Sequence, residues 1–234
     1  MKKRKHALLK LTKKELKMEN QEVKAISLPR LNEKAPAFDA VTTHGRATLE
    51  DYKGKWLILF SHPADFTPVC TTEFIAFQER KPQFDALNCE LLGLSIDSHH
   101  SHLAWTLNIK EKFGIDIEFP IIADLDMKVA TTYGMVHPGA ADTSAVRATF
   151  IIDDKGVLRA MMYYPMSNGR SMDEFVRMVK AMQTSDKHRV ATPAAWQPGE
   201  KVIVPPAATI EEAKSRLASS NFDCVDFYFC TKSL

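Results

Sequence analysis

The chain alternates short runs of consecutive apolar residues with longer segments in which apolar residues recur at helical spacing. Residues 55–61, 89–97 and 119–123 are the first three apolar runs. Short apolar runs bounded by turn residues are typical of strands that are buried on both faces. We therefore expect three buried strands at these positions.

Helices are predicted between and after these strands. Two segments, one from residue 71 onward and one over 99–113, carry apolar residues at helical intervals: Phe74, Phe77 and Phe84 in the first, and Leu103, Leu107 and Ile109 in the second. A short helix over 124–133 would end at Gly134. Cys70 would then lie where the first strand and its turn meet the first helix.

A strand, a turn and a second strand are predicted over 148–164, with Gly156 supplying a positive φ in the turn. A helix from Met172 to about Met182 follows. Strands that alternate with helices and end in a hairpin plus a helix predict an α/β sandwich of the thioredoxin kind, and the hairpin makes its central sheet mixed.

The composition changes after residue 187, where Pro193, Pro198, Pro205 and Pro206 precede one more predicted helix, over 209–218. Thr209 would cap this helix, with Glu212 three residues on. The apolar tail over 222–230 must lie on its own domain or on a partner subunit. We expect a basic, disordered extension over 1–24, a thioredoxin-like domain over 25–186 and a small C-terminal dimerisation extension over 187–234.

Charge and hydropathy exclude two classes of partner. Residues 1–17 hold eight Lys or Arg and one Glu, a net charge of +7 in a chain of net charge +2, which leaves −5 for the other 217 residues. An acidic body offers no broad cationic face to nucleic acid. No stretch approaches the roughly 18 apolar residues of a membrane span, and no export signal is recognisable. We expect a cytoplasmic protein that binds neither nucleic acid nor membranes.

The four cysteines, Cys70, Cys89, Cys224 and Cys230, are too few for a disulfide scaffold, so we expect thiol chemistry. Cys70 is the reactive candidate, because the free N–H groups of a helix N-terminus favour a thiolate. Pro63 would shield its sulfur from water and the hydroxyl of Thr67 would hydrogen-bond thiolate and substrate. Arg147, at the start of a later strand, is the candidate cation that stabilises negative charge.

The pattern Pro63-x-x-x-Thr67-x-x-Cys70, followed by Thr71-Thr72-Glu73 and with Arg147 on a later strand, resembles the peroxiredoxin signature. The resemblance runs from about residue 28 to the C-terminus. Residues 61–73 are most similar to the branch with one-cysteine peroxiredoxins and archaeal thioredoxin peroxidases. It implies a peroxidase with no metal or organic cofactor that reduces hydrogen peroxide and organic hydroperoxides. It also implies a homodimer, in many members assembled into a decamer of five dimers.

Carried over residue by residue, the resemblance makes Cys70 the cysteine that becomes a sulfenic acid, with Thr67 and Arg147 positioning the peroxide. Glu73 would orient the arginine, Arg170 would be a second arginine of the site, and His62 would lie near the reactive sulfur. The pair Cys224 and Cys230 resembles the C-terminal pair of the archaeal enzymes. Cys230 of the partner subunit would then resolve the sulfenic acid, Cys224 would capture the bond to give Cys224–Cys230, and a thioredoxin-like protein would reduce it.

Several other interpretations remain open. A one-cysteine peroxidase would use an external thiol, and an oligomeric holdase or binding scaffold would not need Cys70. A disulfide reductase would require a C-x-x-C motif, which the chain lacks. Cys89 opens an apolar strand and is expected to be inert. The spacing of Cys224 and Cys230 disfavours zinc, and we expect His99, His100 and His102 to form a solvated polar face rather than a ligand set.

Overall fold

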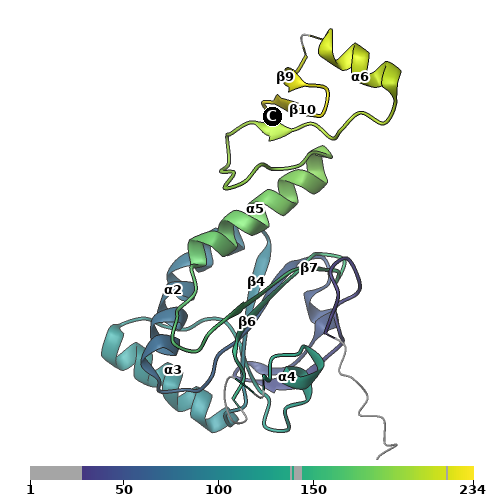
Figure 1. The fold of residues 1–234 in the computed structure, drawn as a ribbon. Coiled ribbons are helices and arrows are strands. Elements are labelled where there is room, and N and C mark those ends of the chain that lie inside the picture. Colours follow the sequence, from purple (N-terminus) through teal and green to yellow (C-terminus); the bar gives the residue numbers. More distant parts are fainter. Residues whose placement is uncertain (1–27, 138, 140–143, 220) are drawn as a thin grey trace, which may run out of the picture.

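The computed structural model describes residues 28–137, 139, 144–219 and 221–234 (Figure 1). The predicted basic extension over 1–24 lies outside these residues. The main sheet has seven strands: β1 (Asp39–Thr42), β2 (Gly45–Thr48), β3 (Trp56–Ser61), β4 (Cys89–Ser95), β5 (Ile121–Ala123), β6 (Arg147–Ile152) and β7 (Leu158–Tyr164). A 3-10 helix, η1 (Leu49–Tyr52), follows β2.

The strand order is β2-β1-β5-β4-β3-β6-β7. The central strands β3, β4 and β5 run parallel to one another, whereas β6 and β7 are antiparallel additions beside β3, and β1 and β2 are antiparallel additions beside β5. The predicted mixed sheet is confirmed. The β1–β2 hairpin, which has only one buried residue (Thr42), was not predicted because it lacks an apolar run.

Four helices cover the sheet: α2 (Pro68–Asp85), α3 (His99–Phe113), α4 (Lys128–Thr132) and α5 (Met172–His188). Side chains of β3 alternate between two apolar cores. Trp56, Ile58 and Phe60 pack with α2, α3 and α5, while Leu57 and Leu59 pack on the opposite face with α4. This alternation is the pleat of a strand that is buried on both sides.

The predicted apolar face of α3 is wrong for Leu103 and Leu107 and right for Ile109. Leu103 and Leu107 are 36% and 67% exposed, and the buried face is formed by His102, Trp105 and Ile109. These three residues recur at intervals of three and four, so they share one side of the helix. The helix therefore turns a histidine, rather than a leucine, toward the core.

Three helix boundaries also differ from the prediction. α4 begins at Lys128 rather than at residue 124. α2 begins at Pro68, three residues before Thr71, because proline suits the first helical position. α5 continues to His188 and ends at Arg189, which has a left-handed φ of 52°. No helix of the described residues is long and apolar enough to cross a membrane.

The C-terminal residues form a small unit beyond the end of α5, away from the main sheet (Figure 1). Its strands β8 (Val202–Ile203), β9 (Asp223–Asp226) and β10 (Phe229–Lys232) pair in the order β8-β10-β9, and α6 (Ile210–Leu217) precedes β9. Thr209 caps α6 as expected, since its Oγ1 accepts a hydrogen bond from Glu212 N at 3.1 Å. The strands β9 and β10 were not predicted.

Candidate active site

Cys70 lies in the first turn of α2 and is fully buried. Thr67 is the N-cap of this helix and Pro68 its first residue. The first N–H groups of a helix have no intrahelical acceptor, and the helix dipole places partial positive charge there. The sulfur is therefore held where a negative charge is stabilised.

Arg147 reaches the same place from the first residue of β6. Its Nη1 donates to Cys70 Sγ at 3.3 Å, and its Nε and Nη2 both donate to the carbonyl of Met166, at 2.9 and 2.7 Å. With its side chain 3% exposed, the guanidinium is fixed and poorly solvated. Its charge acts on the sulfur with little screening.

Glu73 binds both arginines from the next turn of α2. Its Oε2 lies 2.8 Å from Arg147 Nη1 and 2.7 Å from Arg170 Nη2, and its Oε1 accepts from Arg170 Nε at 2.8 Å. Burial alone would raise the pKa of Glu73, but the hydrogen bond from Arg170 and the two guanidinium charges outweigh it and lower the pKa. Two cations and one carboxylate leave one net positive charge beside Cys70.

Arg170 is held by further contacts. Its Nη1 donates to Ala148 O at 2.9 Å and to Thr149 Oγ1 at 3.2 Å, and the guanidinium lies 5.4 Å from the Phe60 ring centroid. Among the described residues, Arg170 makes no hydrogen bond with Cys70. Its link to Arg147 and Cys70 runs through Glu73.

Thr67 does not make the hydrogen bond to Cys70 that the sequence suggested. Its hydroxyl donates to Ala64 O at 2.8 Å, which leaves the oxygen lone pairs available as acceptors. Pro63 is buried in the loop between β3 and α2. The orientation of Thr67 suits an incoming O–H donor.

His62 and two residues that the sequence analysis missed, Asp65 and His102, form a buried polar cluster next to this loop. His62 Nε2 lies 2.9 Å from Asp65 Oδ1, and His102 Nδ1 lies 2.8 Å from Asp65 Oδ2. Neither histidine ring is exposed. The expected solvated face is thus wrong for His102; its spacing to Trp105 and Ile109 was the sequence signal that places it on the buried side of α3.

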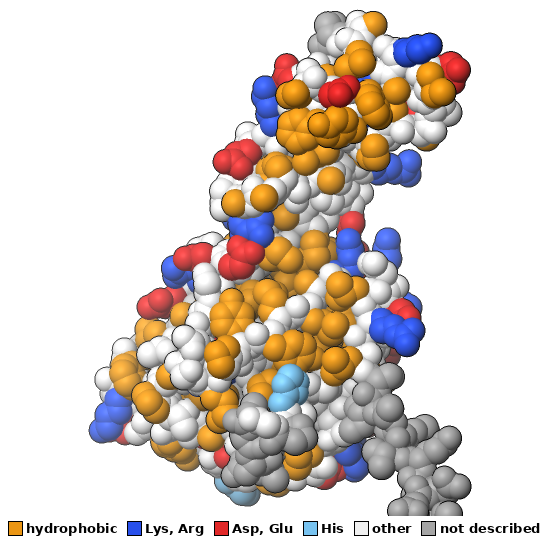
Figure 2. Space-filling view, in the orientation of Figure 1, with side chains coloured by type: hydrophobic (Ala, Val, Ile, Leu, Met, Phe, Trp, Pro, Cys, Tyr) orange, Lys and Arg blue, Asp and Glu red, His pale blue; other side chains and the backbone are white. Residues whose placement is uncertain are grey.

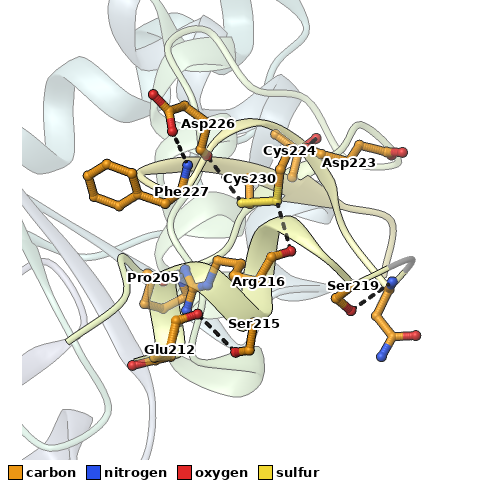
Figure 3. Close-up of a disulfide and its surroundings, with 12 residues drawn as sticks. Pro205, Glu212, Ser215, Arg216, Ser219, Asp223, Cys224, Asp226, Phe227 and Cys230 are labelled. Carbon is orange, nitrogen blue, oxygen red and sulfur yellow. Dashed lines mark hydrogen bonds and ion pairs between the residues drawn. A yellow bond between two sulfur atoms is a disulfide. The ribbon is translucent and has the colours of Figure 1, made fainter. Parts of the chain in front are cut away.

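Cys224 and Cys230 are joined by a disulfide between the paired strands β9 and β10 (Figure 3). Cys224 is half-buried and Cys230 is fully buried. Cys89 is free and buried, and burial raises the pKa of its thiol. The structure thus leaves Cys70 as the free cysteine that lies beside a cation.

Comparison with known proteins identifies matching families and close relatives in sequence. The sequence model of the AhpC/TSA family matches residues 31–161, and that of the C-terminal domain of 1-Cys peroxiredoxin matches residues 181–220. A peroxiredoxin of Aquifex aeolicus is 54% identical over 91% of this chain and 100% of its own length. A peroxiredoxin of Methanocaldococcus jannaschii is 51% identical over 88% of this chain and 100% of its own.

Solved structures agree with these relatives. The yeast mitochondrial 1-Cys peroxiredoxin is 39% identical, with a TM-score of 0.78 over 88% of this chain and 100% of its own. A mutant of peroxiredoxin 6 of Arenicola marina is 33% identical, with a TM-score of 0.79 over 87% of this chain and 97% of its own.

The fold and the buried cysteine–arginine pair define a thioredoxin-fold protein with a thiol site, which confirms the expected fold class. The chain belongs to the peroxiredoxin family. Membership in this family supports thiol peroxidase activity.

Proposed function

We propose that Cys70 is the cysteine that reacts with hydrogen peroxide and small organic hydroperoxides. The contact of 3.3 Å between Arg147 Nη1 and Cys70 Sγ, in the first turn of a helix, carries this proposal. A thiolate attacks the terminal peroxide oxygen: the S–O bond forms, the O–O bond breaks, and the departing alkoxide or hydroxide takes a proton. Cys70 becomes a sulfenic acid, and the peroxide is reduced to an alcohol or water.

The neighbouring residues take distinct roles in this step. Arg147 stabilises the thiolate and the negative charge that grows on the departing oxygen. Thr67, whose own proton goes to Ala64 O, accepts a hydrogen bond from the peroxide hydroxyl. Glu73 and Arg170 hold Arg147 in place. His62 supports the reaction from the buried side, and Pro63 keeps the sulfur away from bulk water. No step requires a metal or an organic cofactor.

For the second half of the cycle we propose resolution by Cys230 of a second copy of the chain, followed by transfer of the bond to Cys224. The disulfide between Cys224 and Cys230 is the product that this transfer leaves. A thioredoxin-like protein would reduce it. The solved yeast relative is described as resolved through glutathione and thioredoxin systems, which gives two reductants to compare.

The C-terminal unit supports a dimer. Its tail exposes Val225, Phe227, Tyr228 and Phe229 by 82%, 44%, 62% and 43%, and Figure 2 shows apolar side chains gathered on this unit. The tail therefore does not bury these side chains on its own domain, and a partner subunit would cover them. We propose that residues 187–234 form this dimerisation extension, next to the peroxidase domain over 25–186, and that dimers can assemble into a decamer.

A one-cysteine cycle is the second candidate, favoured by the match of residues 181–220 to the C-terminal domain of 1-Cys peroxiredoxin. In that cycle an external thiol reduces Cys70 directly. Both candidates suit a reducing cytoplasm, which is where we propose that the protein acts.

Peptide mapping under non-reducing conditions separates the two cycles. The fully reduced protein receives one equivalent of hydrogen peroxide and is analysed by mass spectrometry and on a denaturing gel. A covalent dimer with a Cys70–Cys230 peptide supports the two-cysteine cycle, whereas a monomer with sulfenic acid at Cys70 supports the one-cysteine cycle. An unmodified Cys70, or a Cys70→Ser variant that consumes peroxide at the parental rate, would refute the proposed peroxidase site.

A further inference from the structure

The buried cluster of His62, Asp65 and His102 joins three separate elements. His62 follows β3, Asp65 lies in the loop that leads to Cys70, and His102 belongs to α3. The side chains of the two histidines are unexposed and that of Asp65 is 2% exposed. A buried polar cluster of this kind is costly unless its hydrogen bonds are satisfied, so its proton arrangement is strongly constrained.

Both ring nitrogens of His102 face acceptors. Nδ1 lies 2.8 Å from Asp65 Oδ2, and Nε2 lies 3.2 Å from the carbonyl oxygen of Ile122. A carbonyl oxygen cannot donate, and neither can an ionised carboxylate. The ring of His102 is therefore held between two oxygen atoms, one from the loop before Cys70 and one from β5.

Asp65 remains ionised in this cluster. Burial alone would raise the pKa of Asp65, but hydrogen bonds from His102 and His62 outweigh that effect and hold the pKa well below its usual range. The backbone N–H of Asp65 also donates to Asp97 Oδ2 at 2.9 Å. Asp65 is thus held at its carboxylate by His102 of α3 and at its backbone by Asp97, which follows β4.

The charge of Asp65 decides the tautomer of His62. His62 Nε2 faces Asp65 Oδ1 at 2.9 Å and must donate its proton there, while burial lowers the pKa of His62 and keeps the ring neutral. Nδ1 then carries a lone pair, and this buried atom has no hydrogen-bond partner in the described structure. A buried acceptor without a partner destabilises the folded state, so we expect this atom to gain a partner during the reaction.

The His62 ring packs against residues of the apolar core that also holds Cys70. The His62 ring contacts Phe74 with 4.7 Å between ring centroids, and Phe74 is one helical turn beyond Cys70 on α2. Trp105 contacts both rings, with centroids 5.1 Å from His62 and 4.6 Å from Phe74. Phe74, Trp105 and Cys70 belong to the same apolar cluster.

The same three residues offer ligand atoms within 4.8 Å of one another, which is also the arrangement of a metal site. Two ligand atoms that are each about 2.0–2.1 Å from a tetrahedral zinc stand about 3.3 Å apart. The observed separations of 2.8 and 2.9 Å are those of charge-assisted hydrogen bonds. The distances therefore favour shared protons over a bound metal.

We propose that Asp65 and His102 are positioning residues for the reaction of Cys70. Asp65, held in place by His102, fixes His62 as the tautomer protonated at Nε2, so that Nδ1 is available as an acceptor during peroxide reduction. This inference rests on the proposed function of Cys70. Asp65 and His102 act through His62 and touch neither the peroxide nor the sulfur.

A double-mutant cycle tests the proposal. Oxidation of Cys70 by hydrogen peroxide is followed by stopped-flow tryptophan fluorescence, which Trp105 reports from beside His62. Asp65→Asn should slow oxidation by about tenfold or more, because the wrong tautomer disables an acid–base histidine. In a His62→Gln background the same substitution should cause no further loss. His102→Gln should behave in the same way, and it carries the test if Asp65→Asn does not fold.

The control is His100→Gln, an exposed histidine two residues away on α3, which should keep the parental rate. Three outcomes would overturn the proposal: a parental rate in both Asp65→Asn and His102→Gln, losses that add fully to that of His62→Gln, or one equivalent of metal that is present in the parent and lost from His102→Gln. In each of them the parent still oxidises Cys70, so failure here is distinct from failure of the peroxidase assignment.

Discussion

Arg147 Nη1 lies 3.3 Å from Cys70 Sγ, although 77 positions separate the two residues in the chain. The reason is the pairing of β6 with β3. Phe60, near the end of β3, pairs with Thr149 near the start of β6, so the first residue of β6 lies at the edge where β3 leads into the Cys70 loop. The cation is therefore positioned by a strand rather than by a flexible loop.

Replacing this cation should slow the peroxide step. We expect Arg147→Ala to reduce the second-order rate constant for Cys70 oxidation by about a hundredfold or more, the usual loss when a donor to a developing anion is removed. Stopped-flow fluorescence measures this constant. Arg159→Ala is the control, since Arg159 pairs with Asp153 and Asp186 elsewhere. An unchanged rate in Arg147→Ala would remove Arg147 from the mechanism.

Glu73 should matter for stability as well as for the site. Glu73→Gln leaves Arg147 and Arg170 buried without a counter-charge, which typically costs 3–5 kcal/mol of unfolding free energy. Urea denaturation of the reduced protein measures this difference. The exposed Glu90, paired with Lys55, provides the comparison: Glu90→Gln should cost less than about 1 kcal/mol. Equal losses of unfolding free energy in the two variants would contradict the proposed contribution of Glu73 to stability.

The stabilisation by Glu73 should depend on pH. Because its pKa is lowered in the folded state from an ordinary value of 4.5, its contribution is fully present above that value and is lost as the pH falls through the folded-state pKa. The difference in unfolding free energy between the parent and Glu73→Gln should therefore be constant from about pH 6 to 7 and shrink below about pH 4.5. Urea titrations at a series of pH values test this, and a difference that grows on acidification would refute it.

The disulfide between Cys224 and Cys230 should stabilise the C-terminal unit locally. Because the disulfide reduces the chain entropy of the open unit, it raises the free energy of opening by about 2 kcal/mol. Reducing the disulfide should therefore speed amide exchange in β9 and β10 by about thirtyfold. Hydrogen exchange of a Cys70→Ser variant, with and without dithiothreitol, measures the effect. Strands β3 and β6 serve as internal controls, and Cys224→Ser should match the reduced protein in both conditions. Equal protection of β9 and β10 with and without the bond would contradict the prediction.

The sequence alone predicted the elements that carry long apolar signals. The apolar runs at β3 and β4 and the phenylalanine spacing of α2 identified strand, turn and helix around Cys70, because a strand buried on both faces and an amphipathic helix each leave a distinct period in the chain. The family signature around Cys70 named Arg147 and Glu73 as partners. Short elements with little burial, such as β1, β2 and β9, left no such period.

Only the tertiary structure decided which polar residues meet inside the protein. Periodicity assigned Leu103 and Leu107 to the core, yet the folded chain buries His102, since Asp65 and the carbonyl of Ile122 satisfy its two nitrogens there. Arg170 likewise finds its partner in another segment, since Glu73 lies 97 positions away in the chain. A hydrogen bond between distant residues lowers the cost of burial only once the chain has brought them together, and hydropathy along the sequence carries no record of that pairing.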